Sequence, residues 1–403
     1  MTTAGNIPVS PSSAEGDASF LTAKTPSYWT QVVRDTLSRG GARAGSAWIL
    51  VLILTAVFAP FLASSWPYLL EMDGKWSSPL LKHLTPQDVD LLVLAGSVVT
   101  AAFFCRVSIA KRAIWVGSIQ IVTILSSYVL IHPPLTNDWQ YYRDLDRSGK
   151  LQYKIMAPVP FSANDYQRDL SDTMLKAPSH LHLLGTEANG GDVLSRMIHA
   201  CRIALAIGVI STGLSIAIGI AVGGLMGYFG GNVDMLGMRL IEIFEAIPTL
   251  FLLIIFIAFF GRNLYYMMAI IGLTSWTGDA RYIRAEFLRL REQDFVQAAV
   301  AGGLPLRSII FRHLLPNGIS PILVTASFGI ASAILFESIL SFLGIGLIEE
   351  PSWGQMLNQS LGVGGDFIWW IAFYPGLAIF LTVFSYNLLG ESLRDAMDPK
   401  LRR

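Results

Sequence analysis

The side chains that could bind a metal ion lie in one polar stretch of the sequence. His180 and His182 are two residues apart, and Glu187 follows a short distance later. Zinc sites use a fuller set of ligands at regular spacings, and no such set accompanies this pair. We therefore favour a solvated loop at this position and expect no metal.

Carboxylates within apolar segments form a second group of candidates. Glu242, Glu245 and Glu337 lie in or beside long apolar runs. A charge inside a membrane costs several kcal/mol unless it faces protein or water. Glu245 and Glu337 are therefore candidates for lining a polar cavity, whereas Glu242 lies close to the end of its run. Pairing that holds helices together explains Glu245 and Glu337 equally well.

Motifs for catalysis do not occur in the sequence. There is no G-x-x-x-x-G-K-[ST] segment for nucleotide phosphates, and no serine lies in a G-x-S-x-G setting. We expect no catalytic residues, no cofactor and no ATP hydrolysis by this chain.

The elements that must position these residues are apolar. Of the 403 residues, 53% are hydrophobic and 14% are charged, and the net charge is zero. Soluble chains are about 25% charged, so this composition argues against a soluble enzyme, and it excludes a disordered chain. A nucleic-acid partner would require a basic face. We conclude that the surrounding solvent is a lipid bilayer.

Eight apolar runs are candidates for crossing the ~30 Å hydrocarbon core of a bilayer. The sequence therefore predicts an all-α integral membrane protein. The sixth run is the most polar, because it ends near Thr274, Ser275, Thr277 and Asp279, and it could extend to Phe287. The runs are Ser46–Ser65, Leu91–Cys105, Ala113–Ile131, Arg202–Tyr228, Leu240–Phe260, Leu264–Trp276, Ile319–Leu343 and Ile368–Leu389.

The distribution of basic residues in short loops predicts the orientation. Lysine and arginine concentrate on the cytoplasmic side of membrane proteins, which places both termini inside and the long polar segment 132–200 outside. Cys105 and Cys201 then lie near opposite membrane faces, too far apart for a disulfide.

Two features predict local geometry within the spans. Gly219, Gly223 and Gly227 form a small-residue stripe that permits close helix approach. The stripe could pack within this chain or against a partner, and we lean slightly towards the partner. Pro248 removes a helix hydrogen bond and should kink its span.

The segment 294–316 is the most informative part of the sequence. Gln297–Ala301 favours a short helix, Gly302 and Gly303 end it, and Pro305 can begin a second helix. This pattern predicts a helix–turn–helix across the membrane surface, with Ala298 and Ala299 forming a smooth face. The pattern alone fits a docking surface and an ordinary amphipathic loop equally well.

This segment resembles the EAA loop of permease subunits of ATP-binding-cassette (ABC) importers, E-A-A-x-x-x-G followed by I-x-L-P. The matching residues are Gln297, Ala298, Ala299, Gly303, Leu315 and Pro316. Gln297 replaces the usual glutamate, which puts any ion pair of that carboxylate in doubt. His313 replaces isoleucine, and 311–317 (F-R-H-L-L-P-N) is similar to the dipeptide/oligopeptide/nickel branch.

Further matches extend the resemblance over the second half of the chain. They are L-G-T-E-A-N-G-G-D-V-L-S-R at 184–196, with Gly191 where arginine is usual, F-E-S-I-L-S-F-L-G at 336–344, P-S-W-G at 351–354 and R-D-A-M-D-P at 394–399. The segments 227–231, 248–255 and 284–289 resemble the Yej-type peptide permeases most. The resemblance implies the type I transmembrane fold, with about six core spans plus an inserted hairpin near 91–131.

This resemblance implies the following division of the chain. It comprises a cytoplasmic tail (1–45), a first span (46–66), an inserted region with the hairpin (67–131), a periplasmic loop (132–200), a permease core (201–393) with a coupling loop (289–316), and a cytoplasmic tail (394–403).

The resemblance also implies partners and a location. A bacterial inner-membrane permease of this family works beside a second permease, two ABC ATPases that grip the coupling loop, and a periplasmic or lipid-anchored binding protein. Glu245 and Glu337 become candidate residues of the substrate pathway. The cargo could be peptides, peptide-like antibiotics, nickel chelates or opines. An ion-coupled secondary carrier is the alternative from another class, but it would show charged relays or an inverted repeat.

Overall fold

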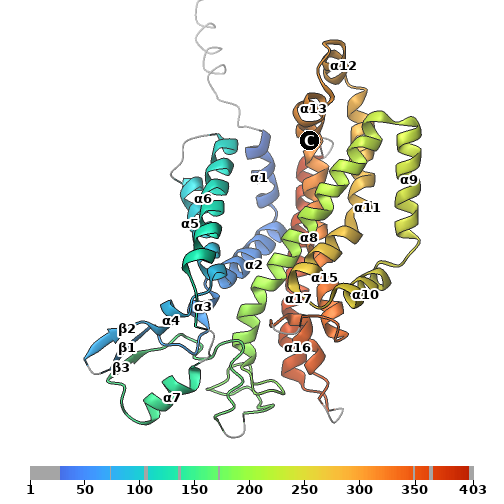
Figure 1. Ribbon diagram of the computed structural model, residues 1–403. Coiled ribbons are helices and arrows are strands. Elements are labelled where there is room, and N and C mark those ends of the chain that lie inside the picture. Colours follow the sequence, from blue (N-terminus) through green and yellow to red (C-terminus); the bar gives the residue numbers. More distant parts are fainter. Residues whose placement is uncertain are drawn as a thin grey trace, which may run out of the picture.

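The computed structural model describes residues 28–72, 74–103, 108–134, 138–170, 173–347, 350–362 and 366–398. It is a bundle of long helices with a small β-sheet region at one end and a pair of short helices at the other (Figure 1). We call these the sheet end and the loop end. Cys105 lies outside the described residues, and Cys201 is buried with a free thiol.

The N-terminal helices α1 (Tyr28–Ser38), α2 (Gly40–Val57) and α3 (Ala59–Leu62) include the predicted first span. Helix α1 packs against the C-terminal helix α17, where Arg39 forms an ion pair with Asp395. Helix α2 ends near Pro60 because proline has no N–H for the carbonyl of Ala56. The guanidinium of Arg202 donates to that carbonyl instead, at 2.6 Å.

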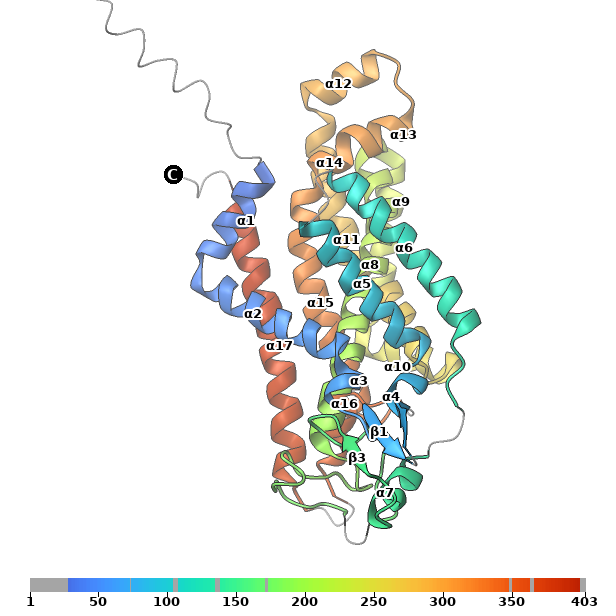
Figure 2. The ribbon, with the colours of Figure 1, turned by 90° about the vertical axis from the view of Figure 1, so that its left-hand side faces the viewer.

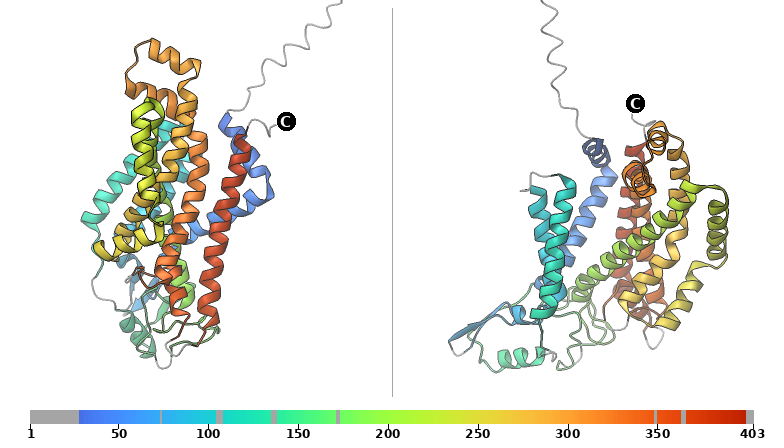
Figure 3. Two further views of the ribbon diagram at one scale, coloured as in Figure 1. Left: turned by 90° about the vertical axis from the view of Figure 1, so that its right-hand side faces the viewer. Right: turned by 45° about the horizontal axis from the view of Figure 1, so that its top comes forward.

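The inserted region forms the predicted hairpin from α5 (Pro86–Phe103) and α6 (Ile109–Leu130). Ser127 Oγ donates to Asp90 Oδ1 at 2.9 Å and joins the two helices. The hairpin reaches the core chiefly through α2, which lies between them (Figure 3, right). Asp88 at the start of α5 forms an ion pair with Arg202 of the core.

A small antiparallel sheet departs from the all-α prediction. Strands β1 (Leu69–Met72), β2 (Lys75–Ser77) and β3 (Tyr153–Ile155) pair in the order β2-β1-β3. They are too short for a period-two pattern to show in the sequence, and β3 joins the sheet from a position far along the chain. Helices α4 (Pro79–Lys82) and α7 (Trp139–Arg147) lie near this sheet (Figure 2).

The core is built on the long helix α8 (Val193–Phe229) and helix α11 (Leu264–Arg291), which pack along each other. The glycine stripe of α8 makes this contact. A Cβ on Gly219 would lie 2.7 Å from Asp279 Cβ, and one on Gly223 only 2.3 Å from the Ala280 carbonyl oxygen. The stripe therefore packs within this chain, and our leaning towards a partner subunit was wrong.

The span count differs from the prediction at two places. The run 240–260 is two helices, α9 (Gly231–Glu245) and α10 (Thr249–Phe260), bent by 78° at the break before Pro248. The run 264–276 is only the first half of α11, whose second half is charged. Among the described residues, six helices are long and apolar enough to cross a membrane, and the bent pair could make a seventh.

The chain ends with α12 (Asp294–Ala301), α13 (Leu306–Ser308), a π-helical turn (Ile309–Leu314), α14 (Leu315–Asn317), α15 (Ile319–Phe342), α16 (Trp353–Gln359) and α17 (Trp369–Met397). Helix α15 packs on α8 and α17 and so completes the core. Helix α16 lies at the sheet end, whereas α12 to α14 form the loop end (Figures 1 and 2).

Candidate functional site

The protruding loop, which we define as residues 294–317, has the predicted helix–turn–helix shape. Helix α12 ends at Ala301, and Gly303 follows with φ of +70°, a left-handed conformation that glycine adopts without strain. Pro305 precedes α13 and caps its start. The loop extends beyond the ends of the neighbouring core helices (Figures 1 and 2).

One side of the protruding loop is anchored in an apolar cluster. Its buried members on the loop are Val296, Ala299, Ile309 and Leu314. They pack against Ile283, Phe287 and Leu290 of α11 and Ile322 of α15. Ile216, Ile220 and Tyr228 of α8 pack against the same cluster, which therefore joins the loop to three core helices.

The other side of the loop is exposed and largely apolar. Phe295, Val300 and Leu304 are each at least 40% exposed at the tip of the molecule. Ala298 faces outward with them, whereas Ala299 is buried. The predicted smooth face of both alanines is wrong, because neighbouring helical residues point about 100° apart.

The side-chain amide of Gln297 makes a hydrogen bond that the usual glutamate could not make. Its Nε2 donates to the carbonyl of Arg291 at 2.9 Å and so caps the C-terminus of α11. A glutamate carboxylate has no hydrogen to donate to a carbonyl. At the other end of the loop, Leu315 is half-buried beside the cluster and Pro316 is exposed.

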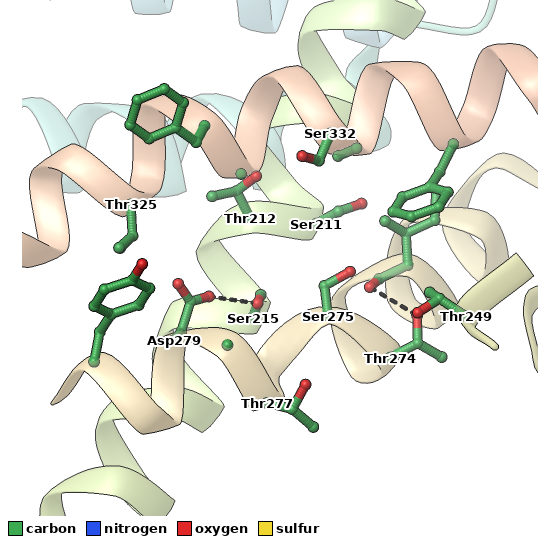
Figure 4. A pocket seen from close by; sticks show the side chains of 17 residues that line it. Ser211, Thr212, Ser215, Thr249, Thr274, Ser275, Thr277, Asp279, Thr325 and Ser332 are labelled. Carbon is green, nitrogen blue, oxygen red and sulfur yellow. Dashed lines mark hydrogen bonds between the residues drawn. The ribbon is translucent and has the colours of Figure 1, made fainter. Parts of the chain in front are cut away.

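A cavity of about 440 Å³ lies between α8, α11 and α15, beside the first residue of α10 (Figure 4). Most of its lining side chains carry hydroxyl groups, including Thr212, Ser275 and Ser332. Asp279 supplies a carboxylate, whose Oδ2 accepts a hydrogen bond from Ser215 Oγ at 2.6 Å. In the sequence, Asp279 served only as evidence against a membrane span. Its position in a cavity could not be predicted, because the cavity forms only where three helices pack together.

The two carboxylates that we predicted for a pathway lie outside this cavity. Glu245 Oε2 is 2.6 Å from Arg281 Nη2 near the break between α9 and α10. Glu337 is buried in α15 and accepts a hydrogen bond from Ser341 Oγ at 2.7 Å. Glu242, beside Arg239, is exposed. The role of Glu245 and Glu337 in a pathway stays a prediction.

The stretch with the histidines is structural rather than solvated. His182 Nδ1 lies 2.9 Å from Asp192 Oδ2, and Asp192 caps the start of α8 by accepting from Ser195 N. Glu187 is fully buried, with Oε2 3.0 Å from Arg196 Nε. Burial raises the pKa of Glu187 to about 7, because desolvation outweighs the attraction of Arg196. Of the three residues, only His180 is exposed.

Comparison with known proteins identifies the family. The family described as "Binding-protein-dependent transport system inner membrane component" matches residues 219–403. The inner membrane ABC transporter permease protein YejE of Escherichia coli is 32% identical over 88% of this chain and 92% of its own length. The chain belongs to this family.

Two further relatives are similar over a shorter range. The oligopeptide transport system permease protein OppC of Haemophilus influenzae is 40% identical over 55% of this chain and 71% of its own length. The dipeptide transport system permease protein DppC of Bacillus subtilis is 38% identical over 56% of this chain and 71% of its own length. The permease is therefore a multi-pass inner-membrane component of the peptide branch of ABC importers and is not itself the ATPase.

Proposed function

We propose that this permease, together with a second permease, forms the pathway for peptides or peptide-like substrates. A periplasmic or lipid-anchored binding protein delivers the cargo. Two separate ABC ATPases hydrolyse ATP and act on the protruding loop. The relatives named for oligopeptide and dipeptide transport support the choice of cargo.

The observation that carries this proposal is the two-sided character of the protruding loop. Its outer side exposes Phe295, Val300 and Leu304, which water solvates poorly and another protein could cover. Its inner side is fixed to α11 and α15 by buried apolar contacts. Because α8 also packs against these contacts, a force applied to the outer side reaches the three helices that form the cavity.

Rigid-body motion is the mechanism that this arrangement supports. Packed side chains transmit strain because protein interiors are dense and hard to compress. Closure of an ATPase dimer would displace α12, and α11 and α15 would follow as rigid bodies. Helix α8, which packs along α11, would move with them, and the motion of these helices against the second permease would change access to the pathway.

Two valines on α12 offer a matched crosslinking test. Val300 is 48% exposed, whereas Val296, one turn earlier in the same helix, is 1% exposed because the apolar cluster covers it. We expect Val300→Cys, but not Val296→Cys, to crosslink in native membranes to a subunit that carries a nucleotide-binding P-loop. Mass spectrometry of the crosslinked product identifies the partner. If Val300→Cys yields no such product, the proposed coupling role is wrong.

A further inference from the structure

The carboxylate of Asp279 has no positive partner within the described part of this chain. The nearest arginines on its own helix form ion pairs with other carboxylates: Arg281 pairs with Glu245, and Arg284 pairs with Asp234. The described hydrogen-bond partners of Asp279 are the neutral hydroxyls of Ser215 and Thr325. A carboxylate among membrane-spanning helices that lacks a counter-charge is a strong indicator of a functional site.

A second polar group in the same cavity also lacks a partner. Thr212 is 5% exposed, and its Oγ1 has no hydrogen-bond partner among the described residues. Buried hydroxyls normally have one. Figure 4 shows Thr212 on α8, facing the cavity beside Asp279 and Ser215. The cavity therefore contains an unneutralised charge and an unsatisfied hydroxyl.

The cavity is partly open, and polar side chains lie at its exposed edge beside Phe328. Ser332 and Tyr282 are exposed at the opening, and Gly278 leaves space because a Cβ there would meet no atom within 4 Å. Hydroxyl groups at the depth of the spans face water or protein rather than acyl chains. The volume of about 440 Å³ lies within the usual range for small-ligand pockets.

We propose that this cavity binds the free amino group of the cargo, with the carboxylate of Asp279 as its counter-charge and Thr212 as a hydrogen-bond acceptor. The inference rests on the proposed function, since a peptide carries an α-ammonium group whatever its side chains. A metal ion fits less well, because a single carboxylate among neutral hydroxyls provides too little charge for a hard divalent cation. An ammonium group needs one carboxylate and a few acceptors.

Thiol modification inside the cavity tests the inference without knowledge of the natural cargo. Ser332→Cys supplies a thiol at the opening, in a chain that also carries Cys105→Ser and Cys201→Ser. The rates of its reaction with 2-aminoethyl methanethiosulfonate, an ammonium compound, and with neutral methyl methanethiosulfonate are measured in the transporter purified from native membranes. We expect Asp279→Asn to lower the ratio of these rates about tenfold, through loss of the Coulomb attraction.

Ser215→Ala is the matched control for a purely structural role. It removes the Ser215–Asp279 hydrogen bond but keeps the charge, whereas Asp279→Asn keeps an acceptor and removes the charge. We expect Ser215→Ala to retain the wild-type ratio. An unchanged ratio in Asp279→Asn, or an equal loss in both variants, overturns the inference.

Protection by peptides identifies the bound group and does not depend on folding of the Asp279 variant. With Asp279 intact, trialanine should slow modification of Ser332→Cys, and N-acetyl-trialanine should protect at least about tenfold less well. Equal protection by both peptides, or none by either, contradicts cargo binding through the amino group. The Val300 crosslink tests the proposed function independently. If the crosslink forms but trialanine gives no selective protection, the proposed function is still supported and only the inference about the cavity is wrong.

Discussion

At the scale of single residues, the buried contact between Glu187 and Arg196 at the start of α8 links several segments of the chain. Arg196 donates to the carbonyl of Ala163 at 3.0 Å and to Gln355 Oε1 at 3.1 Å, besides its approach to Glu187. It thereby joins α8 to α16 and to the segment before α8. Gly191 leaves the space for this pair, because a Cβ there would lie 2.9 Å from Glu187 Oε1.

The raised pKa of Glu187 predicts a pH-dependent stability. The folded state holds the proton up to about pH 7, whereas the unfolded carboxyl releases it near its ordinary pKa of 4.5. Stability should therefore fall as pH rises through this window, by an amount on the order of 3 kcal/mol. We expect the thermal midpoint of the purified permease, followed by tryptophan fluorescence, to decrease from pH 5 to pH 8.

Glu187→Gln removes this titration while keeping the side-chain shape. The variant should show a flatter dependence of the midpoint on pH than the wild type. Asp144→Asn changes a carboxylate in α7 that is exposed and should leave the slope unaltered. If Glu187→Gln and the wild type have the same slope, the Glu187 carboxyl is not the group responsible.

At the scale of secondary-structure elements, proline and glycine decide where helices end and how they meet. Pro60 and Pro248 each lack the N–H that would continue a helix, and the chain turns at both positions. Arg202 satisfies the carbonyl left free near Pro60 and also pairs with Asp88. One residue of the core therefore holds both the first span and the inserted hairpin.

Gly303 provides a test of how the protruding loop transmits force. Its φ is +70°, and a Cβ at this position would meet no atom within 4 Å. Glycine is therefore required here for its left-handed backbone conformation, and not because a side chain would clash with neighbouring atoms. Proline fixes φ near −65°, so Gly303→Pro should displace α12 and abolish peptide uptake by membrane vesicles, while immunoblots show normal insertion.

Gly303→Asn is the matched control, because asparagine tolerates the left-handed region better than other side chains. It should retain most of the uptake. Wild-type transport by Gly303→Pro would show that the conformation of this turn is not needed for coupling.

At the scale of the whole molecule, the sheet end and the loop end lie at opposite ends of the bundle (Figure 2). The proposed function requires the sheet end to face the binding protein and the loop end to face the ATPases. Asn164 and Ala298 are exposed at these two ends.

Cysteine labelling tests this sidedness. In spheroplasts of the cysteine-free background, a membrane-impermeant maleimide should label Asn164→Cys directly. It should label Ala298→Cys only after the membrane is permeabilised. The reverse result would invert the orientation and contradict both the positive-inside prediction and the proposed coupling.

Much of the local structure could be predicted from the sequence alone. The hairpin, the break at Pro248 and the end of α12 at Gly302 and Gly303 follow from apolar run length, the missing proline N–H and the conformational freedom of glycine. These properties act within a few residues and need no distant partner. The motifs that resemble the ABC permease family also identified it correctly.

The tertiary structure alone decided which faces meet. The sequence showed that Gly219, Gly223 and Gly227 share a face, but only packing assigned that face to α11. In the sequence, Asp279 is one polar residue at the edge of the most polar of the apolar runs. In the structure, hydroxyl-bearing residues of α8, α11 and α15 surround it. Contacts between residues more than 50 positions apart depend on the arrangement of all the helices at once. For that reason, the sequence pattern showed which carboxylates lie in apolar runs and which glycines share a helix face. Only the folded structure showed which residues each of them contacts.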